Sequence, residues 1–101
     1  MKGVSIVIPI YNEEENAPLL YKELDQVMSK LSCEYELIFV DDGSKDKTLR
    51  SLMSAAGHDP RVFIIEFRRN FGQTAAMAAG LEHSRFDKVV TMDGDLSLIH
   101  I

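Results

Sequence analysis

The sequence predicts an α/β fold in which a mainly parallel sheet carries helices on both faces. Four short apolar runs rich in β-branched residues alternate with three stretches of helical periodicity. Such alternation is typical of parallel strands joined by right-handed crossover connections. Each apolar run also ends in polar or acidic residues, and ligands of open parallel sheets bind beyond the carboxyl ends of the strands. A strand order of 3-2-1-4 would place the binding crevice between the first and fourth strands.

The first predicted unit is a buried strand followed by a helix. Residues 4–8 are almost continuously apolar, as in a strand buried on both faces, and Pro9 follows because proline cannot donate to a sheet ladder. We expect a helix from about Asn16, with Pro18 tolerated in its first turn. The helical spacing predicts a core-facing stripe made of Leu20, Leu24, Val27, Met28 and Leu31.

The remaining units repeat this pattern. Residues 35–40 and 62–67 are predicted strands, and residues 88–92 form the fourth. Between the first two of these lies a helix with Ser44 or Asp46 as its N-cap and Gly57 at its end. Its predicted apolar face comprises Leu49, Leu52, Met53 and Ala56.

An Ala-rich helix, predicted to end near Ser84, precedes the fourth strand. Gly72, Ala76 and Gly80 follow one another at intervals of four residues, so one face of the helix carries only small side chains. A small face allows the helix to lie close to a strand or to a ligand.

Composition narrows the classes of function. The chain has 101 residues, 46% hydrophobic and 27% charged, with a net charge of -5. No block of Lys and Arg is present, which argues against nucleic acid as the main partner. Cys33 is the single cysteine, so a disulfide within the chain is impossible and a reducing, cytosolic setting fits best. No apolar run approaches the ~20 residues that a membrane-spanning helix needs.

The fourth strand ends in Asp93-Gly94-Asp95. Because Asp93 and Asp95 are two residues apart, their side chains point the same way in extended backbone. Carboxylate oxygens suit Mg²⁺ or Mn²⁺, with phosphate oxygens completing the coordination. The alternative is a solvated turn, which these residue types favour when they are considered alone.

The ends of the other predicted strands carry further candidate ligand-binding residues, and each of these residues has an alternative structural role. Asp42 could accept hydrogen bonds from a nucleobase or ribose, or could cap a helix together with Ser44. Tyr11 could stack on a base or be a partly buried aromatic. Arg68 and Arg69 are more often simply solvated at such positions. No G-x-G-x-x-G follows the first strand and no P-loop motif occurs, which removes the main support for dinucleotide and P-loop sites.

These motifs together carry a family resemblance. Residues 5–13, 39–48 and 92–95, in this order, resemble the start of a family 2 glycosyltransferase with the GT-A fold. Residues 69–80 are similar to the branch of that family that glycosylates polyprenyl phosphates. The resemblance covers nearly all of residues 4–96, and four motifs in the right order make it specific.

The resemblance implies an inverting, metal-dependent transfer of a sugar from a UDP- or GDP-linked donor to a polyprenyl phosphate. It implies that Pro9, Tyr11 and Glu13 line the nucleoside pocket. Val40 would contact the base, and Asp42 would hold base or ribose. Asp93, Gly94 and Asp95 match the family's D-x-D motif, with Asp95 the main ligand of Mg²⁺ or Mn²⁺.

The chain is expected to be an N-terminal fragment. Residues 1–96 would form the nucleotide-sugar-binding part of a GT-A domain truncated after its fourth strand, and residues 97–101 an atypical, artefactual tail. No catalytic residue is identified, because the family's catalytic carboxylate and acceptor region lie farther along. The whole protein is expected at the cytoplasmic face of a membrane, held there through the absent segments. The alternatives are a nucleotide-binding remnant without catalysis and a sugar-1-phosphate nucleotidyltransferase.

Overall fold

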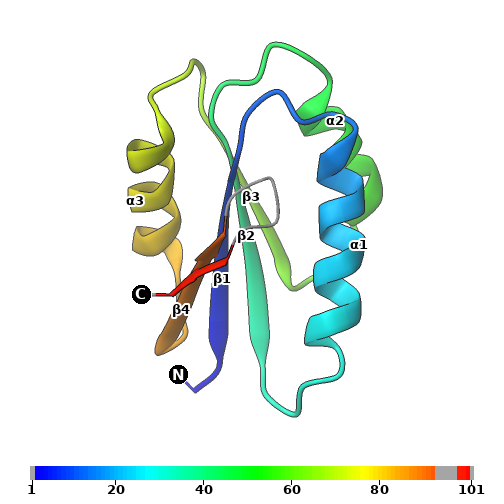
Figure 1. Cartoon of the computed structure of the whole chain (residues 1–101), viewed down its shortest axis with the longest axis vertical. Helices are drawn as coiled ribbons and strands as arrows, with labels where there is room; N and C mark the ends of the chain where they lie inside the picture. Colours follow the sequence, from blue (N-terminus) through cyan, green and yellow to red (C-terminus); the bar gives the residue numbers. More distant parts are fainter. Residues whose placement is uncertain (1, 93–97, 101) are drawn as a thin grey trace.

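The chain folds as alternating strands and helices (Figure 1). The computed structural model describes residues 2–92 and the backbone of residues 98–100. The elements are β1 (Val4–Ile10), α1 (Asn16–Met28), β2 (Tyr35–Asp41), α2 (Thr48–Ala56), β3 (Val62–Glu66), α3 (Gln73–His83), β4 (Lys88–Met92) and β5 (Leu98–His100). The predicted alternation is confirmed.

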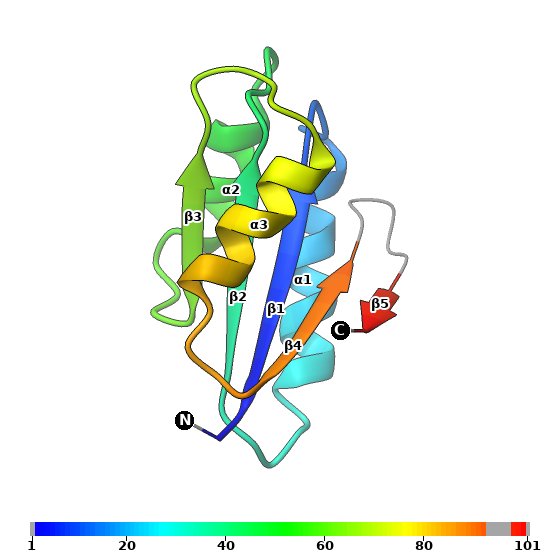
Figure 2. The ribbon, with the colours of Figure 1, turned by 90° about the vertical axis from the view of Figure 1, so that its left-hand side faces the viewer.

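The sheet has the order β3-β2-β1-β4-β5. β1 pairs in parallel with both β2 and β4, and β2 pairs in parallel with β3, so the first four strands have the order 3-2-1-4 that was considered above (Figure 2). β5 pairs antiparallel with β4, with Met92 opposite Leu98. The sheet therefore continues past the fourth strand, where truncation was expected. A run of three residues is too short to show the alternation by which a strand is recognised in a sequence.

The two faces of the sheet are covered unequally. α1 and α2 lie on one face and α3 on the other (Figure 1). Side chains of a strand alternate between the faces, so Ile6, Ile8 and Ile10 belong to the core beneath α1 and α2, whereas Val7 packs with Ala76 of α3. In β2 the odd-numbered Leu37 and Phe39 belong to the first core, and the even-numbered Ile38 and Val40 to the second.

Some predicted core positions of the helices are wrong. Leu20, Leu24 and Met28 are buried as predicted, and Leu52 and Ala56 are buried in α2. By contrast, Val27, Leu31 and Met53 are exposed. Val27 and Met53 lie at the edges of their apolar stripes, and Leu31 lies beyond the end of α1 at Met28.

The small face of α3 lies against a strand. A Cβ atom added at Gly80 would lie 2.2 Å from Cγ1 of Val7 in β1, and Ala76 is fully buried. α3 therefore approaches the sheet more closely than a helix with larger side chains could. In the described part of the chain, no helix is both long and apolar enough to span a bilayer.

Candidate functional site

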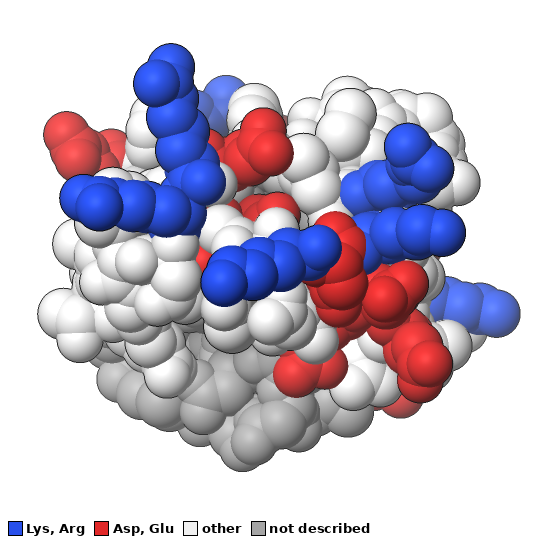
Figure 3. All heavy atoms as spheres, turned by 90° about the horizontal axis from the view of Figure 1, so that it is seen from above, with Lys and Arg blue, Asp and Glu red and all other residues white. Residues whose placement is uncertain are grey.

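The loops that follow β1, β2 and β3 lie together at the carboxyl edge of the sheet, at the top of Figure 1. They comprise residues 11–15, 42–47 and 67–72. Viewed from above, this end of the molecule carries interspersed acidic and basic side chains (Figure 3). The parallel sheet thus gathers polar residues that are far apart in the sequence, as the strand-end pattern predicted.

The loop after β1 is fastened to the loop after β2. Asn12, which has a φ of 53°, donates its backbone N–H to Oγ of Ser44 at 2.9 Å, and its Oδ1 accepts from the backbone N–H of Lys45 at 2.8 Å. Glu13 donates its backbone N–H to Oγ1 of Thr48 at 2.8 Å. These reciprocal bonds fix the backbone of Asn12 and Glu13 relative to the start of α2.

Asp46 binds the first residue of α2. Its Oδ1 accepts from the backbone N–H of Thr48 at 2.9 Å and from the Thr48 hydroxyl. The hydrogen bond from the Thr48 side chain is the main cause of a lowered pKa of Asp46, which the small burial of the carboxyl opposes. The N-cap of α2 is Lys47, which makes no side-chain cap bond, so the prediction of Ser44 or Asp46 as the N-cap is wrong; Asp46 lies one residue before that position. Ser44 instead accepts from Asn12 and donates its hydroxyl to Asp41.

Asp42 is bound to the loop after β3. Its side chain is 4% exposed. Oδ1 accepts from the backbone N–H of Phe71 at 2.8 Å, and Oδ2 accepts from the N–H of Gly72 and from Nδ2 of Asn70, both at 3.1 Å. Asp42 therefore does not cap α2, which was one of its two predicted roles, but holds the segment that leads into α3.

Gly43 completes this junction. It has a φ of +74°, and an added Cβ would lie 2.2 Å from the carbonyl carbon of Arg69. A larger residue is disfavoured there by both backbone conformation and space. The backbones of the loops after β2 and β3 therefore pack directly on each other.

The other predicted nucleoside-binding residues differ in accessibility. Pro9 is buried in β1 beside Val40 of β2, and the Val40 side chain has no exposed surface. Tyr11 is 38% exposed, and Glu13 is half-buried with Oε2 accepting from Nδ2 of Asn16 at 2.8 Å. Tyr11 and Glu13 are thus able to meet a ligand, whereas the side chain of Val40 faces α3 instead.

The predicted metal ligands Asp93 and Asp95, with Gly94 between them, lie outside the described residues. Within residues 2–92, no group of three or more His, Cys, Asp or Glu side chains is arranged to hold a metal ion. Asp41 and Asp42 are committed to hydrogen bonds with Ser44 and with residues 70–72. The metal-binding roles of Asp93 and Asp95 therefore stay predictions.

An aromatic and cationic cluster stands beside the Asp42 junction. Phe71 is 54% exposed, and its ring meets Phe67 edge-to-face at a centroid distance of 5.6 Å. The guanidinium of Arg69 lies over the Phe71 ring, 4.7 Å from its centroid. The sequence showed the exposed arginines but not this stacking, since it depends on the turn that Asp42 holds.

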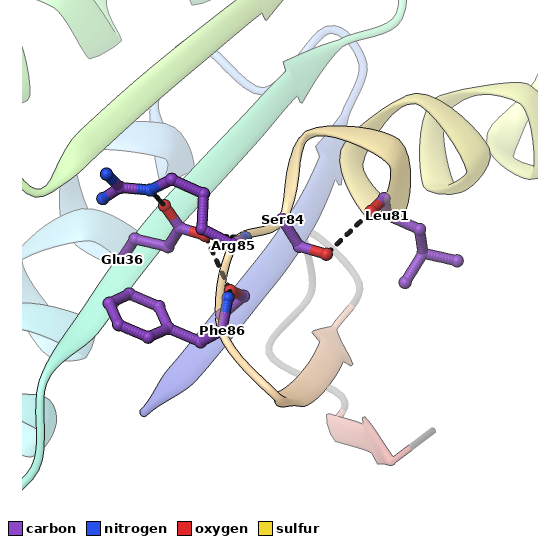
Figure 4. Close-up of polar contacts among 6 residues, drawn as sticks. Glu36, Leu81, Ser84, Arg85 and Phe86 are labelled. Atoms are coloured by element: carbon purple, nitrogen blue, oxygen red, sulfur yellow. Dashed lines mark hydrogen bonds and ion pairs between the residues drawn. The ribbon is translucent and has the colours of Figure 1, made fainter. Parts of the chain in front are cut away.

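Sequence reasoning also missed a buried network at the other end of the sheet (Figure 4). Glu36 of β2 is 1% exposed. Its Oε2 accepts from the Ser5 hydroxyl at 2.7 Å and from the backbone N–H of Arg85 at 2.8 Å, and its Oε1 accepts from Nε of Arg85 at 2.9 Å. Ser5 in turn accepts from the backbone N–H of Phe86 at 3.2 Å. The sequence contained one indication of this network, because Ser5 and Glu36 are polar residues within two otherwise apolar predicted strands.

The Glu36 network lowers the pKa of its carboxyl group. Burial alone would raise the pKa of Glu36, but the hydrogen bonds from Ser5 and Arg85 and the positive charge of Arg85 outweigh it, so the pKa falls below its ordinary value. The network lies at the amino ends of the strands, away from the loops after β1, β2 and β3. It fastens the connection between α3 and β4.

The parallel sheet with helices on both faces and polar loops at its carboxyl edge defines a doubly wound α/β protein. The chain belongs to glycosyl transferase family 2, whose model matches residues 5–99. Solved structures of GT-A glycosyltransferases share this fold, with TM-scores of 0.73 and 0.77, so the fold is GT-A, as the resemblance implied.

Two curated relatives and one solved structure illustrate the similarity. The chain is 47% identical over 94 residues to the undecaprenyl-phosphate 4-deoxy-4-formamido-L-arabinose transferase of Pseudomonas fluorescens, covering 92% of this chain and 28% of that protein. It is 41% identical over 93 residues to a prophage bactoprenol glucosyl transferase homolog of Escherichia coli, covering 92% and 30%. The mannosyltransferase PcManGT of Pyrobaculum calidifontis, in complex with GDP-Man and Mn²⁺, aligns with a TM-score of 0.73 and 28% identity, covering 91% and 27%. The chain thus spans about three tenths of the length of these relatives.

Proposed function

We propose that the chain forms the donor-binding part of an enzyme that transfers a sugar from a nucleoside-diphosphate sugar to a polyprenyl phosphate. The observation that carries this proposal is the 47% identity, over 92% of the chain, to a transferase named for undecaprenyl phosphate. The loops after β1 and β2, fastened to each other by Asn12 and Ser44, supply a rigid rim for such a donor.

The nucleoside would lie against the loop after β1. Tyr11 offers an exposed ring to a base, and Glu13 an accessible carboxylate whose backbone is fixed by Thr48. Stacking a base on an aromatic ring contributes ~1–3 kcal/mol. Pro9 supports this loop from within the sheet. Backbone groups near Val40 and Asp42 would contribute at the neighbouring strand end.

Asp93 and Asp95 would hold Mg²⁺ or Mn²⁺ beside the diphosphate. When bound, the ion supplies positive charge that stabilises the departing diphosphate. The solved relative with GDP-Man and Mn²⁺ supports a divalent ion in this fold. β4 pairs in parallel with β1, with Thr91 opposite Val7, so β4 runs toward the edge of the sheet that carries Tyr11 and Glu13.

The acceptor is proposed to be a polyprenyl phosphate bound by parts of the whole protein beyond this chain. Its phosphate is already anionic, so attack on the anomeric carbon with inversion needs little help from a general base. The reaction would take place at the cytoplasmic face of a membrane, where the lipid phosphate meets the soluble donor. The isolated 101-residue chain is expected to transfer no sugar.

Calorimetry with UDP and with GDP, each with and without Mn²⁺, tests the donor half of this proposal. We expect binding that requires Mn²⁺ and that is lost in Asp95→Asn. Glu82→Gln, which removes one exposed acidic side chain from α3, is the matched control and should bind as the wild type does. Binding without metal dependence, or no binding in any condition, would favour a remnant without transferase chemistry.

A further inference from the structure

Hydroxyl groups near the start of α2 bind two successive backbone amides of the loop after β1. Asn12 donates its N–H to Oγ of Ser44 at 2.9 Å, and Glu13 donates its N–H to Oγ1 of Thr48 at 2.8 Å. The partners lie 32 and 35 positions apart in the sequence. A hydroxyl oxygen presents a lone pair to such a donor only while its own hydrogen points elsewhere.

An aspartate directs the hydrogen of each of these hydroxyl groups. Ser44 donates its hydroxyl to Oδ1 of Asp41, which also accepts from the backbone N–H of Ser44 at 3.0 Å. Thr48 donates its hydroxyl to Oδ1 of Asp46, which also accepts from the backbone N–H of Thr48 at 2.9 Å. Hydrogen bonds to an ionised acceptor are stronger than bonds between neutral groups. The two aspartates therefore keep the hydroxyl oxygens turned as acceptors toward the loop after β1.

Asn12 adopts a backbone conformation that these contacts support. Its φ of 53° lies in the left-handed region, which residues other than glycine seldom adopt. Its Oδ1 accepts from the backbone N–H of Lys45 at 2.8 Å, so its side chain and its backbone are both bonded to the segment Ser44–Lys45. Asn12 lies between Tyr11 and Glu13, the accessible residues of the candidate nucleoside site. A change of φ at Asn12 would therefore reorient these two side chains relative to each other.

We propose that Asn12 and Ser44 are positioning residues of the donor site, which act on the nucleotide through Tyr11 and Glu13. Asp41 orients the Ser44 hydroxyl, the hydroxyl holds the Asn12 backbone, and this backbone sets the directions of the Tyr11 ring and the Glu13 carboxylate. The inference rests on the proposed function, because it assumes that the nucleoside binds beside Tyr11.

Ser44→Ala tests the hydroxyl contact. It removes the acceptor of the Asn12 N–H, so amide hydrogen exchange at Asn12, followed by NMR in the free protein, should become about tenfold faster. Calorimetry with UDP and with GDP in the presence of Mn²⁺ should show affinity that is about tenfold weaker. Ser44→Thr keeps a hydroxyl and should restore both properties. Ser54→Ala is the matched control, because Ser54 is an exposed serine of α2, and it should change neither property.

Asn12→Gly tests the other side of the same contact and serves as the second variant. Glycine adopts a φ of 53° without strain but lacks the Oδ1 that accepts from Lys45. Affinity should again fall. The double variant with Ser44→Ala should lose less affinity than the product of the two single losses, because both substitutions weaken one connection between the loops. Losses that simply multiply would overturn the proposal, since the two residues would then act independently.

Exchange in the free protein separates positioning from direct contact. Faster exchange at Asn12 together with weaker binding supports the proposal. Weaker binding with unchanged exchange would mean that Ser44 contacts the nucleotide itself, and faster exchange with unchanged binding would mean a role in stability alone; either result overturns it. If the wild type binds a nucleotide and both variants bind it equally well, only this inference fails. If the wild type binds neither UDP nor GDP, the proposed function fails, and this inference fails with it.

Discussion

The two ends of α3 are held by the same strand in the same way, yet they serve different parts of the molecule. Glu36 lies in β2 and Asp42 directly follows the strand, six positions later, and both side chains bind residues next to α3. Glu36 accepts from the backbone N–H of Arg85, just after the helix, and Asp42 accepts from those of Phe71 and Gly72, just before it. One end lies at the amino edge of the sheet, where it joins α3 to β4. The other lies at the carboxyl edge, beside the candidate donor site.

The dimensions explain why one strand can hold both ends. Six residues of extended strand span about 20 Å, at ~3.3 Å per residue. An 11-residue helix such as α3 is about 16 Å long. The strand segment therefore exceeds the helix by only ~4 Å, about the length of one extended residue. Two buried acidic side chains at this spacing set the position of the helix along the sheet.

Glu36→Ala should have the largest effect on stability, because it removes the hydrogen bonds that Glu36 accepts from Ser5 and Arg85 at the amino edge of the sheet. The Ser5 hydroxyl and the backbone N–H of Arg85 would lose their acceptor in a buried place. We expect the free energy of unfolding to fall by about 3 kcal/mol, from the lost bonds and the unpaired donors. Urea denaturation measures it.

Glu34→Ala is the control for that substitution, since Glu34 is a nearby exposed residue of the same charge. Its effect should stay within about 0.5 kcal/mol. A similar loss in both variants would show that the Glu36 network contributes little, and the comparison between the two ends of α3 would fail.

Gly80→Ala should have the next largest effect, because it disturbs the middle of α3. Alanine favours a helix over glycine by ~1 kcal/mol, but overpacking a close contact costs about 1–3 kcal/mol. The added Cβ would lie 2.2 Å from Cγ1 of Val7, so overpacking should dominate and urea denaturation should show a net loss of stability. Combining it with Val7→Ala should cost less than the sum of the two single changes. Strict additivity would mean that the contact with Val7 is not the cause.

Acidification should lower the free energy of unfolding, because protonation of Glu36 weakens its hydrogen bonds at the amino edge of the sheet. Its folded-state pKa lies below the ordinary value of 4.5, so its contribution to stability is complete above pH 4.5 and is lost as pH falls through the folded-state pKa. The wild type should therefore lose stability on acidification more steeply than Glu36→Gln. The test is the urea midpoint of both proteins at a series of pH values below 6. Parallel curves would contradict the lowered pKa of Glu36.

The order of strands and helices could be predicted because it rests on local periodicity. The apolar residues of β1 and β2 recur as buried strands require, and Ala17, Leu20 and Leu24 recur at helical spacing. Which residues at the edge of a stripe are buried could not be predicted in the same way. Val27 is exposed because burial there depends on what packs beside α1, which its own spacing does not contain.

The contacts of the candidate site were less predictable than the fold. Asp42 was recognised as a polar strand end, but its partners lie 28 to 30 positions away in the sequence. Glu36 was not recognised, since its partners lie 31 and 49 positions away. Long-range pairs of this kind become visible only when the register of the strands is known. The metal-binding roles of Asp93 and Asp95 and the nucleoside contacts of Pro9 and Tyr11 stay predictions.

The smallest expected effect is from Arg85→Ala, and it asks which part of the Glu36 network matters. The Arg85 side chain is 52% exposed where it meets Glu36 at 2.9 Å. Solvent therefore screens this ion pair, and its loss should cost no more than about 1 kcal/mol. The backbone N–H of Arg85 and the Ser5 hydroxyl still bond to Glu36 in this variant. Arg61→Ala is the control, because both guanidinium groups lie over aromatic rings: that of Arg85 is 5.2 Å from the Phe63 centroid, and that of Arg61 is 5.0 Å from the Tyr35 centroid. If Arg85→Ala costs as much as Glu36→Ala, the charge of Arg85 holds this end of α3. If it costs little more than Arg61→Ala, the amide and hydroxyl donors hold it, as backbone amides do at Asp42.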